Sequence, residues 1–130
     1  MDLLTIEQVE DQEFEIHVRS HRVASDMGLD DDGHDLGPSP TELLVGSLGA
    51  CIGMVITRYC KAIDCSTEGL ALYLTYQLAE KPKRVQSIVI DLELPKAFPE
   101  DRKPAIQQLI RMCPVHGTLS EPPEIDIEIE

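Results

Sequence analysis

Four cysteines are the residues of this 130-residue chain with the clearest capacity for chemistry. Cys51 ends the stretch SPTELLVGSLGAC (39–51), and Cys113 stands beside a proline and a histidine in MCPVHGTLS (112–120). A thiol can pack as a small apolar side chain, ligate a metal, or take part in redox reactions. The residues around each cysteine favour one or another of these three uses.

Packing is the use that the sequence favours for Cys60 and Cys65, because no partner motif accompanies them. A metal site is a weaker hypothesis. Cys113-Pro-Val-His116 has the spacing of a ligand pair, but a structural zinc site usually has four ligands in two short-spaced pairs. Cys60 and Cys65 would have to be the second pair. We therefore expect no metal.

A redox pair is the third possibility, and it concerns Cys51 and Cys113, which lie 62 positions apart. A thiol that reduces a peroxide reacts as the thiolate, which nearby positive charge or hydrogen-bond donors must stabilise. The resulting sulfenic acid needs a second thiol to resolve it as a disulfide. Cys51 lies about 18 Å from the start of its helix, where the helix dipole has faded. An arginine from elsewhere would have to activate it. On the residues alone, the redox pair and plain packing stand level.

A long helix must position Cys51. Ser39 and Glu42 form a Ser-x-x-Glu capping box, and Pro40 suits the first helical position. The apolar pattern predicts a helix from there to about Ala62 that is enclosed on all sides. Its small residues form a ridge that another backbone could approach closely: Gly46, Gly49, Ala50 and Gly53.

The remaining elements follow from alternation and turn residues. Alternating apolar residues predict a strand within 14–25, and Gly, Asp and Pro predict a loop over 27–40. Two alternating runs, 70–78 and 88–94, predict an antiparallel hairpin. A second helix is expected over 100–112, with Pro114 stopping it, and a last strand is expected over 125–129. This order of strands and helices predicts an α+β fold in one domain, residues 1–130.

Charge and hydropathy limit the function classes. With 24 acidic and 11 basic residues the net charge is −13, which argues against nucleic acid and anionic membranes as partners. The longest uncharged run, Leu43 to Thr57, is shorter than the ~20 residues of a membrane span. The acidic start MDLLTIEQVE does not resemble a secretory signal. We expect a soluble cytoplasmic protein with mostly reduced cysteines.

Two segments resemble a known family. The stretch from Gly37 to Cys51 (GPSPTELLVGSLGAC) and the stretch from Cys113 to Leu119 (CPVHGTL) resemble the two cysteine motifs of the OsmC/Ohr family, the osmotically inducible and organic-hydroperoxide-resistance proteins. HRVASD (21–26) and the Gly/Asp loop resemble the OsmC-like branch. The resemblance implies an α+β fold with a long central helix wrapped by curved antiparallel sheets. It also implies an intertwined homodimer with active sites near the interface.

The resemblance further implies a reaction. Cys51 would attack an organic hydroperoxide, Cys113 would resolve the sulfenic acid, and a dithiol reductant would regenerate the pair, without a metal or organic cofactor. The alternative is a non-catalytic module on the same fold that binds a small hydrophobic molecule or serves in a stress response.

Four residues are candidates for a supporting role. The peroxidase members carry a glutamate directly after the proline that aligns with Pro40; here that position is threonine, and Glu42 follows it. Those members use an arginine of an N-terminal hairpin to activate the cysteine, and Arg19 and Arg22 are candidates by region. His116 belongs to the second cysteine motif.

Overall fold

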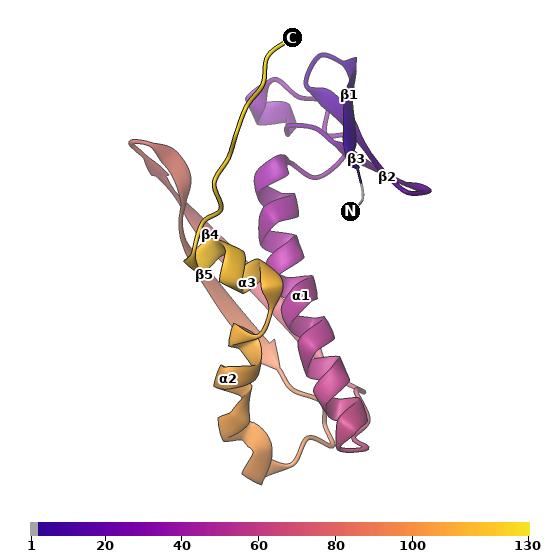
Figure 1. Ribbon diagram of the computed structural model, residues 1–130, viewed down its shortest axis with the longest axis vertical. Helices are drawn as coiled ribbons and strands as arrows, with labels where there is room; N and C mark the ends of the chain where they lie inside the picture. Colours follow the sequence, from indigo (N-terminus) through magenta and orange to yellow (C-terminus); the bar gives the residue numbers. More distant parts are fainter. Residues whose placement is uncertain (1–2) are drawn as a thin grey trace. The chain divides into compact units, whose positions relative to one another are not determined.

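The computed structural model describes residues 3–130 (Figure 1). The chain forms two compact units, which are described separately below. The first unit extends to Leu44, and the second is Val45–Glu130. Helix α1 (Pro40–Ala62) begins in the first unit and continues in the second.

The first unit contains an antiparallel three-stranded sheet, labelled in Figure 1. Its order is β1 (Thr5–Glu10), β2 (Glu13–Val18) and β3 (His21–Ser25). The predicted strand within 14–25 is confirmed as β2, but the chain reverses after it and forms a further strand, β3. Arg19 adopts a positive φ of 53° there, and β2 pairs with β3. Strand β1 was not predicted.

A buried carboxylate organises the predicted loop that follows β3. Asp26 is 1% exposed, and its two oxygens accept three backbone N–H groups. The donors are Met27 at 2.8 Å, His34 at 3.1 Å and Leu36 at 3.3 Å. Burial alone would raise the pKa of Asp26, but these donors outweigh it and hold the pKa below its ordinary value. The loop, which includes η1 (Leu29–Asp31), is therefore folded around an ionised side chain.

The capping box at the start of α1 is present. The backbone N–H of Ser39 donates to Glu42 Oε1 over 2.8 Å, and the N–H of Glu42 donates to Ser39 Oγ over 3.2 Å. The N–H and then the hydroxyl of Ser39 lower the pKa of Glu42. The predicted bounds of the helix, from Pro40 to Ala62, are confirmed.

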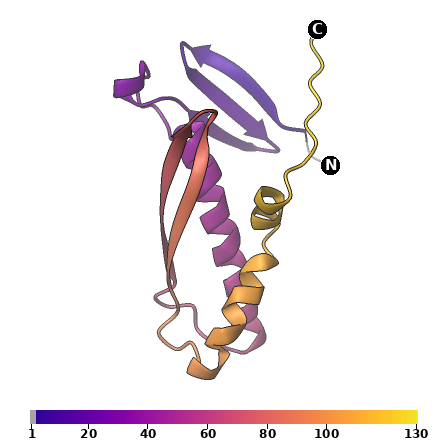
Figure 2. The same cartoon turned by 90° about the vertical axis from the view of Figure 1, so that its left-hand side faces the viewer.

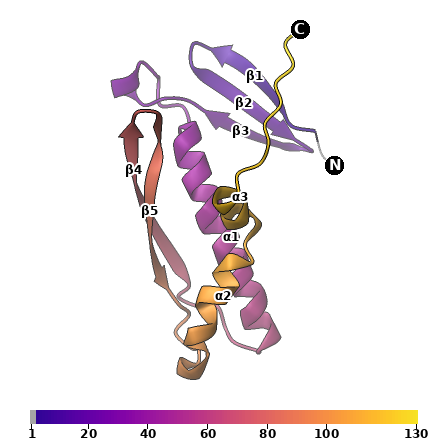
Figure 3. The same cartoon turned by 60° about the vertical axis from the view of Figure 1, so that its left-hand side comes forward.

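The core of the second unit surrounds α1. The predicted hairpin is confirmed as β4 (Ala71–Glu80) and β5 (Lys83–Glu93), which pair antiparallel. Figures 2 and 3 show α1 between this hairpin and the short C-terminal helices. Ile52 and Ile56 of α1 are fully buried in this core. Burying one such side chain contributes about 1.5–3 kcal/mol, so α1 is held mainly by packing.

The C-terminal part differs from the sequence prediction in detail. The helix expected over 100–112 is present, but its first part is the 3-10 helix η2 (Glu100–Ala105) and only α2 (Ile106–Arg111) is α-helical. Pro114 does more than stop it: this proline is the first residue of α3 (Pro114–Ser120). Proline suits that position because the first helical N–H has no partner within the helix.

The expected last strand is absent from the described chain. Residues 121–130 run as an extended trace without a paired strand (Figure 1). Ile125, Ile127 and Ile129 are 82%, 77% and 92% exposed, although they alternate with acidic residues. A strand needs a neighbour for its backbone groups, and these residues have the strand pattern without that neighbour.

The single chain leaves part of α1 uncovered; the predicted enclosure includes cover from a partner subunit, so it stays a prediction. Met54, for example, is 62% exposed. By length and apolar composition α1 could also cross a bilayer. However, the buried side chains of Leu48, Ile52 and Ile56 belong to the core cluster of the second unit. This packing favours the interpretation of α1 as a core helix.

Candidate functional site

The structure brings Cys51 and Cys113 together. Cys51 is half-buried on α1 and packs against the core cluster that contains Cys113. Cys113 is 1% exposed and lies in the short connection between α2 and α3. The Cys51 side chain is close enough to Cys113 to raise the pKa of its thiol, and both are free thiols. Packing of the C-terminal helices against α1 therefore places two reactive groups side by side.

Cys113 is held by the start of α3. Its sulfur caps this helix and accepts a hydrogen bond from the backbone N–H of His116 over 3.4 Å. Burial raises the pKa of the Cys113 thiol, and the neighbouring Cys51 raises it further. The N–H groups of His116 and Val115 act in the opposite direction without reversing the shift. Cys113 is thus a protonated, positioned thiol at neutral pH, which suits a resolving role better than an attacking one.

His116 also borders a shallow pocket of about 440 Å³ along α3. Its ring Nδ1 lies 3.5 Å from Ser120 Oγ, so the backbone of this histidine contacts the cysteine while its ring contacts Ser120. Arg111 lines the same pocket. The sequence prediction did not include this arginine. Its position two residues before Cys113 was the signal that could have identified it.

The other candidate residues belong to the first unit. Glu42 caps α1, so its carboxylate has a structural role. Arg19 lies at the turn between β2 and β3, and Arg22 is an exposed residue of β3 whose Nη1 is 3.9 Å from Glu15 Oε1. Activation of the cysteine pair by Arg19 or Arg22 therefore stays a prediction.

Cys60 and Cys65 are placed beside each other at the end of α1. The packing prediction is confirmed for Cys60, which is fully buried in the core, while Cys65 is half-buried against it. The sequence shows no partner motif for these cysteines, yet the two thiols are neighbours in the structure. Within residues 3–130, no three His, Cys, Asp or Glu side chains are grouped so that they could hold a metal. The four-ligand zinc site considered above is therefore not assembled.

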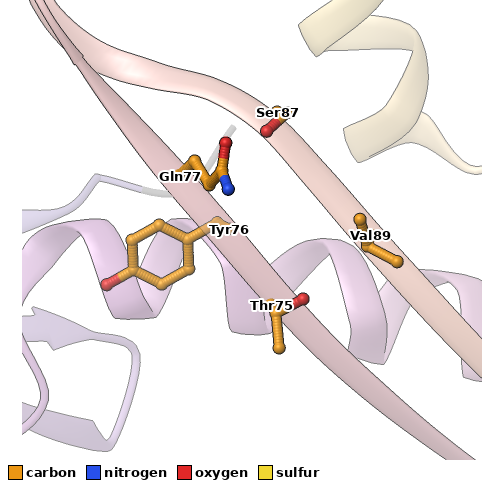
Figure 4. Close-up of a pocket in the computed structure, with 5 residues that line it drawn as sticks. All are labelled: Thr75, Tyr76, Gln77, Ser87 and Val89. Atoms are coloured by element: carbon orange, nitrogen blue, oxygen red, sulfur yellow. The ribbon is translucent and has the colours of Figure 1, made fainter.

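Two other depressions lie on the hairpin side of the second unit. One, of about 300 Å³, is on the face of β4 and β5 shown in Figure 4, where Thr75 pairs with Val89 and Gln77 with Ser87. Its lining residues include no cysteine, histidine or carboxylate. The other, of about 560 Å³, runs between α1 and β4 and is lined by the small residues and Met54: Gly46, Gly49, Ala50, Gly53, Met54, Thr57, Leu70, Ala71, Leu72 and Leu74.

Comparison with solved structures gives the fold. A candidate osmotic-stress-induced and detoxification-response protein from Psychrobacter arcticus matches with a TM-score of 0.83 at 20% identity, over 91% of this chain and 88% of that one. An OsmC-like protein from Mycoplasma pneumoniae matches with a TM-score of 0.80 at 18% identity, over 94% and 89%. An organic hydroperoxide resistance protein from Elizabethkingia anophelis matches with a TM-score of 0.69 at 12% identity, over 93% and 89%. At these identities the likeness shows a shared fold.

Comparison with sequences gives the family. A search of curated proteins finds no significant match. The family model of the OsmC-like proteins matches residues 33–128, which include the whole of α1 and both members of the Cys51–Cys113 pair. The predicted α+β fold, with a long helix and antiparallel sheets, is confirmed. The chain belongs to the OsmC-like protein family.

Proposed function

We propose that the protein reduces organic hydroperoxides with a thiol-based mechanism, in which Cys51 attacks and Cys113 resolves. The observation that carries this proposal is the contact between the half-buried Cys51 and the buried Cys113. Membership of the OsmC-like family supports it, as does the structural match to an organic hydroperoxide resistance protein.

The proposed reaction has three balanced steps. The Cys51 thiolate attacks the terminal oxygen of ROOH, the O–O bond breaks, and an alcohol leaves with one proton taken up. The Cys113 thiol then attacks the sulfur of the Cys51 sulfenic acid, forming the disulfide and releasing water. Finally, an external dithiol reduces the disulfide by two exchange steps and becomes a disulfide itself.

Burial of Cys113 supports its assignment as the resolving thiol and that of Cys51 as the attacking thiol. Its raised pKa keeps it protonated, so it is a weak competitor for the first attack. Its hydrogen bond from His116 fixes the sulfur beside α1. A second thiol already in contact would shorten the life of the sulfenic acid, which otherwise oxidises further.

We also propose that residues 1–130 act as one domain in a cytoplasmic homodimer. The groove along α1 supports a second copy as the partner, because it is apolar and lined by glycines and alanines that allow close approach. The exposed isoleucines of the C-terminal segment support the same proposal, since their alternation suits a strand with one covered face.

Turnover tests this function. Consumption of cumene hydroperoxide with dithiothreitol is measured for the wild type, Cys51→Ser and Cys65→Ser. The proposal expects Cys51→Ser to fall to the uncatalysed rate while Cys65→Ser keeps the wild-type rate. A wild type no faster than Cys51→Ser would refute the activity. In that case native mass spectrometry for a carried apolar ligand would test the binding-module alternative.

A further inference from the structure

The end of helix α1 has a specific hydrogen-bond pattern. The backbone N–H of Cys65 donates to the carbonyl of Cys60 over 2.8 Å, and the N–H of Asp64 donates to the carbonyl of Lys61 over 3.3 Å. Asp64 adopts the left-handed conformation, with φ of 56°. Nested six-residue and four-residue bonds around a left-handed residue define a Schellman motif.

The Schellman motif brings together the side chains of its first and last residues. An apolar contact between the residues at these positions frequently accompanies the motif. Here the two positions are Cys60 and Cys65, so the contact is between two thiols. The geometry of the helix end, rather than chance proximity, therefore holds these sulfurs beside each other.

The two thiols have unequal environments. Cys60 is fully buried, and burial raises the pKa of its thiol, with a further contribution from the adjacent Cys65. Cys65 is half-buried, and its sulfur lies 3.3 Å from the carbonyl oxygen of Ser66. The candidate active site also combines one half-buried and one buried cysteine: Cys51 is half-buried, and Cys113 is buried with a raised pKa.

We propose that Cys60 and Cys65 are a second redox-active dithiol, separate from Cys51 and Cys113, which forms a disulfide across the C-terminal cap of α1. The oxidant is a low-molecular-weight disulfide. The Cys65 thiolate attacks one sulfur of RSSR, forming a mixed disulfide and releasing one thiolate. Cys60 then attacks the Cys65 sulfur, forms the intramolecular disulfide and releases the second thiol.

Trypsin separates all four cysteines, which makes the pairing directly readable. Cleavage at Arg58 and Lys61 leaves Cys60 in peptide 59–61 and Cys65 in peptide 62–83, because Lys81 precedes a proline. Cys51 falls in peptide 23–58 and Cys113 in peptide 112–130. A Cys60–Cys65 disulfide therefore links peptides 59–61 and 62–83, and a Cys51–Cys113 disulfide links the other two.

The test uses the Cys51→Ser/Cys113→Ser double variant, incubated with oxidised glutathione, alkylated with N-ethylmaleimide and digested without reductant. We expect peptides 59–61 and 62–83 to appear as one linked species and both remaining thiols to resist alkylation. Adding Cys65→Ser should abolish the link. Wild-type protein, treated identically, shows whether the same peptide link forms when Cys51 and Cys113 are unchanged.

Three results would overturn the proposal: full alkylation of both thiols, glutathione retained on Cys65 without a link, or a Cys65–Cys65 bond between chains. The double variant cannot perform the proposed hydroperoxide chemistry, and oxidised glutathione is not a hydroperoxide. Failure of this inference would therefore leave the proposed function untouched, and failure of the proposed function would leave this inference untouched.

Discussion

The thiols of Cys51 and Cys113 are neighbours in one core cluster, although helix α1 carries one and the connection between α2 and α3 carries the other. Cys51 keeps partial exposure, whereas Cys113 is 1% exposed. An attacking thiol must meet its substrate, and a resolving thiol must meet only the first sulfur. The pair therefore has the asymmetry that a two-cysteine peroxide reductase requires.

The first prediction concerns Cys113→Ser. Without the resolving thiol, the sulfenic acid formed on Cys51 should persist, because its neighbour can no longer form a disulfide. Treatment with one equivalent of cumene hydroperoxide followed by dimedone should label peptide 23–58, which contains Cys51. Wild-type protein should give little label. Equal labelling of both proteins would remove the resolving role from Cys113.

A second prediction concerns the dimer. Met54 is 62% exposed in the groove along α1, and Val89 is 57% exposed on the outer face of β5. Met54→Glu should shift the protein from dimer to monomer, because it would bury a charge in the proposed apolar interface. Val89→Glu is the matched control and should leave the dimer intact. Sedimentation velocity measures both; a dimeric Met54→Glu variant would contradict the proposed interface.

The third prediction is a pH dependence at Asp26. Its native pKa is lowered, so the unfolded chain binds this proton more readily than the folded one. The stability that Asp26 contributes is present above its unfolded pKa, about 3.9, and is lost as pH falls through the native pKa. Asp26→Asn should therefore be less stable than the wild type at neutral pH. The difference should narrow as pH falls below the unfolded pKa and through the lowered native pKa.

Urea unfolding at several pH values measures this difference. Asp35→Asn is the control, because Asp35 is an exposed residue of the same loop and asparagine tolerates its positive φ of 55°. It should change stability little at any of these pH values. A gap between the wild type and Asp26→Asn that stays constant with pH would show that its ionisation does not hold the loop.

Local signals explain why parts of the fold were predictable from the sequence. Ser39 and Glu42 cap α1 through contacts three residues apart, and the hairpin has the clean alternation of a sheet with one buried face. Both signals lie within a short segment of chain. The two cysteine motifs carried the family resemblance, and the family assignment is confirmed.

The errors came from features that a single chain's pattern does not specify. The alternation of Phe14, Ile16 and Val18 predicts β2, but nothing in the pattern predicts the reversal at Arg19, where φ is positive, or the pairing of β2 with β3. The pattern of Ile125, Ile127 and Ile129 predicts a strand, yet a strand depends on a neighbour that the described chain does not supply. The contact between Cys60 and Cys65 depends on a left-handed Asp64, a position more often filled by glycine.

The contact between Cys51 and Cys113 could not be derived from spacing, because it depends on how α2 and α3 pack against α1. Its chemistry is open to one direct measurement: peptide mapping after one equivalent of cumene hydroperoxide, with alkylation and digestion in the absence of reductant. The account predicts a disulfide that links peptide 23–58 to peptide 112–130, removed by dithiothreitol and absent from Cys51→Ser. Consumption of the hydroperoxide without this link, or a link that persists in Cys51→Ser, would contradict it.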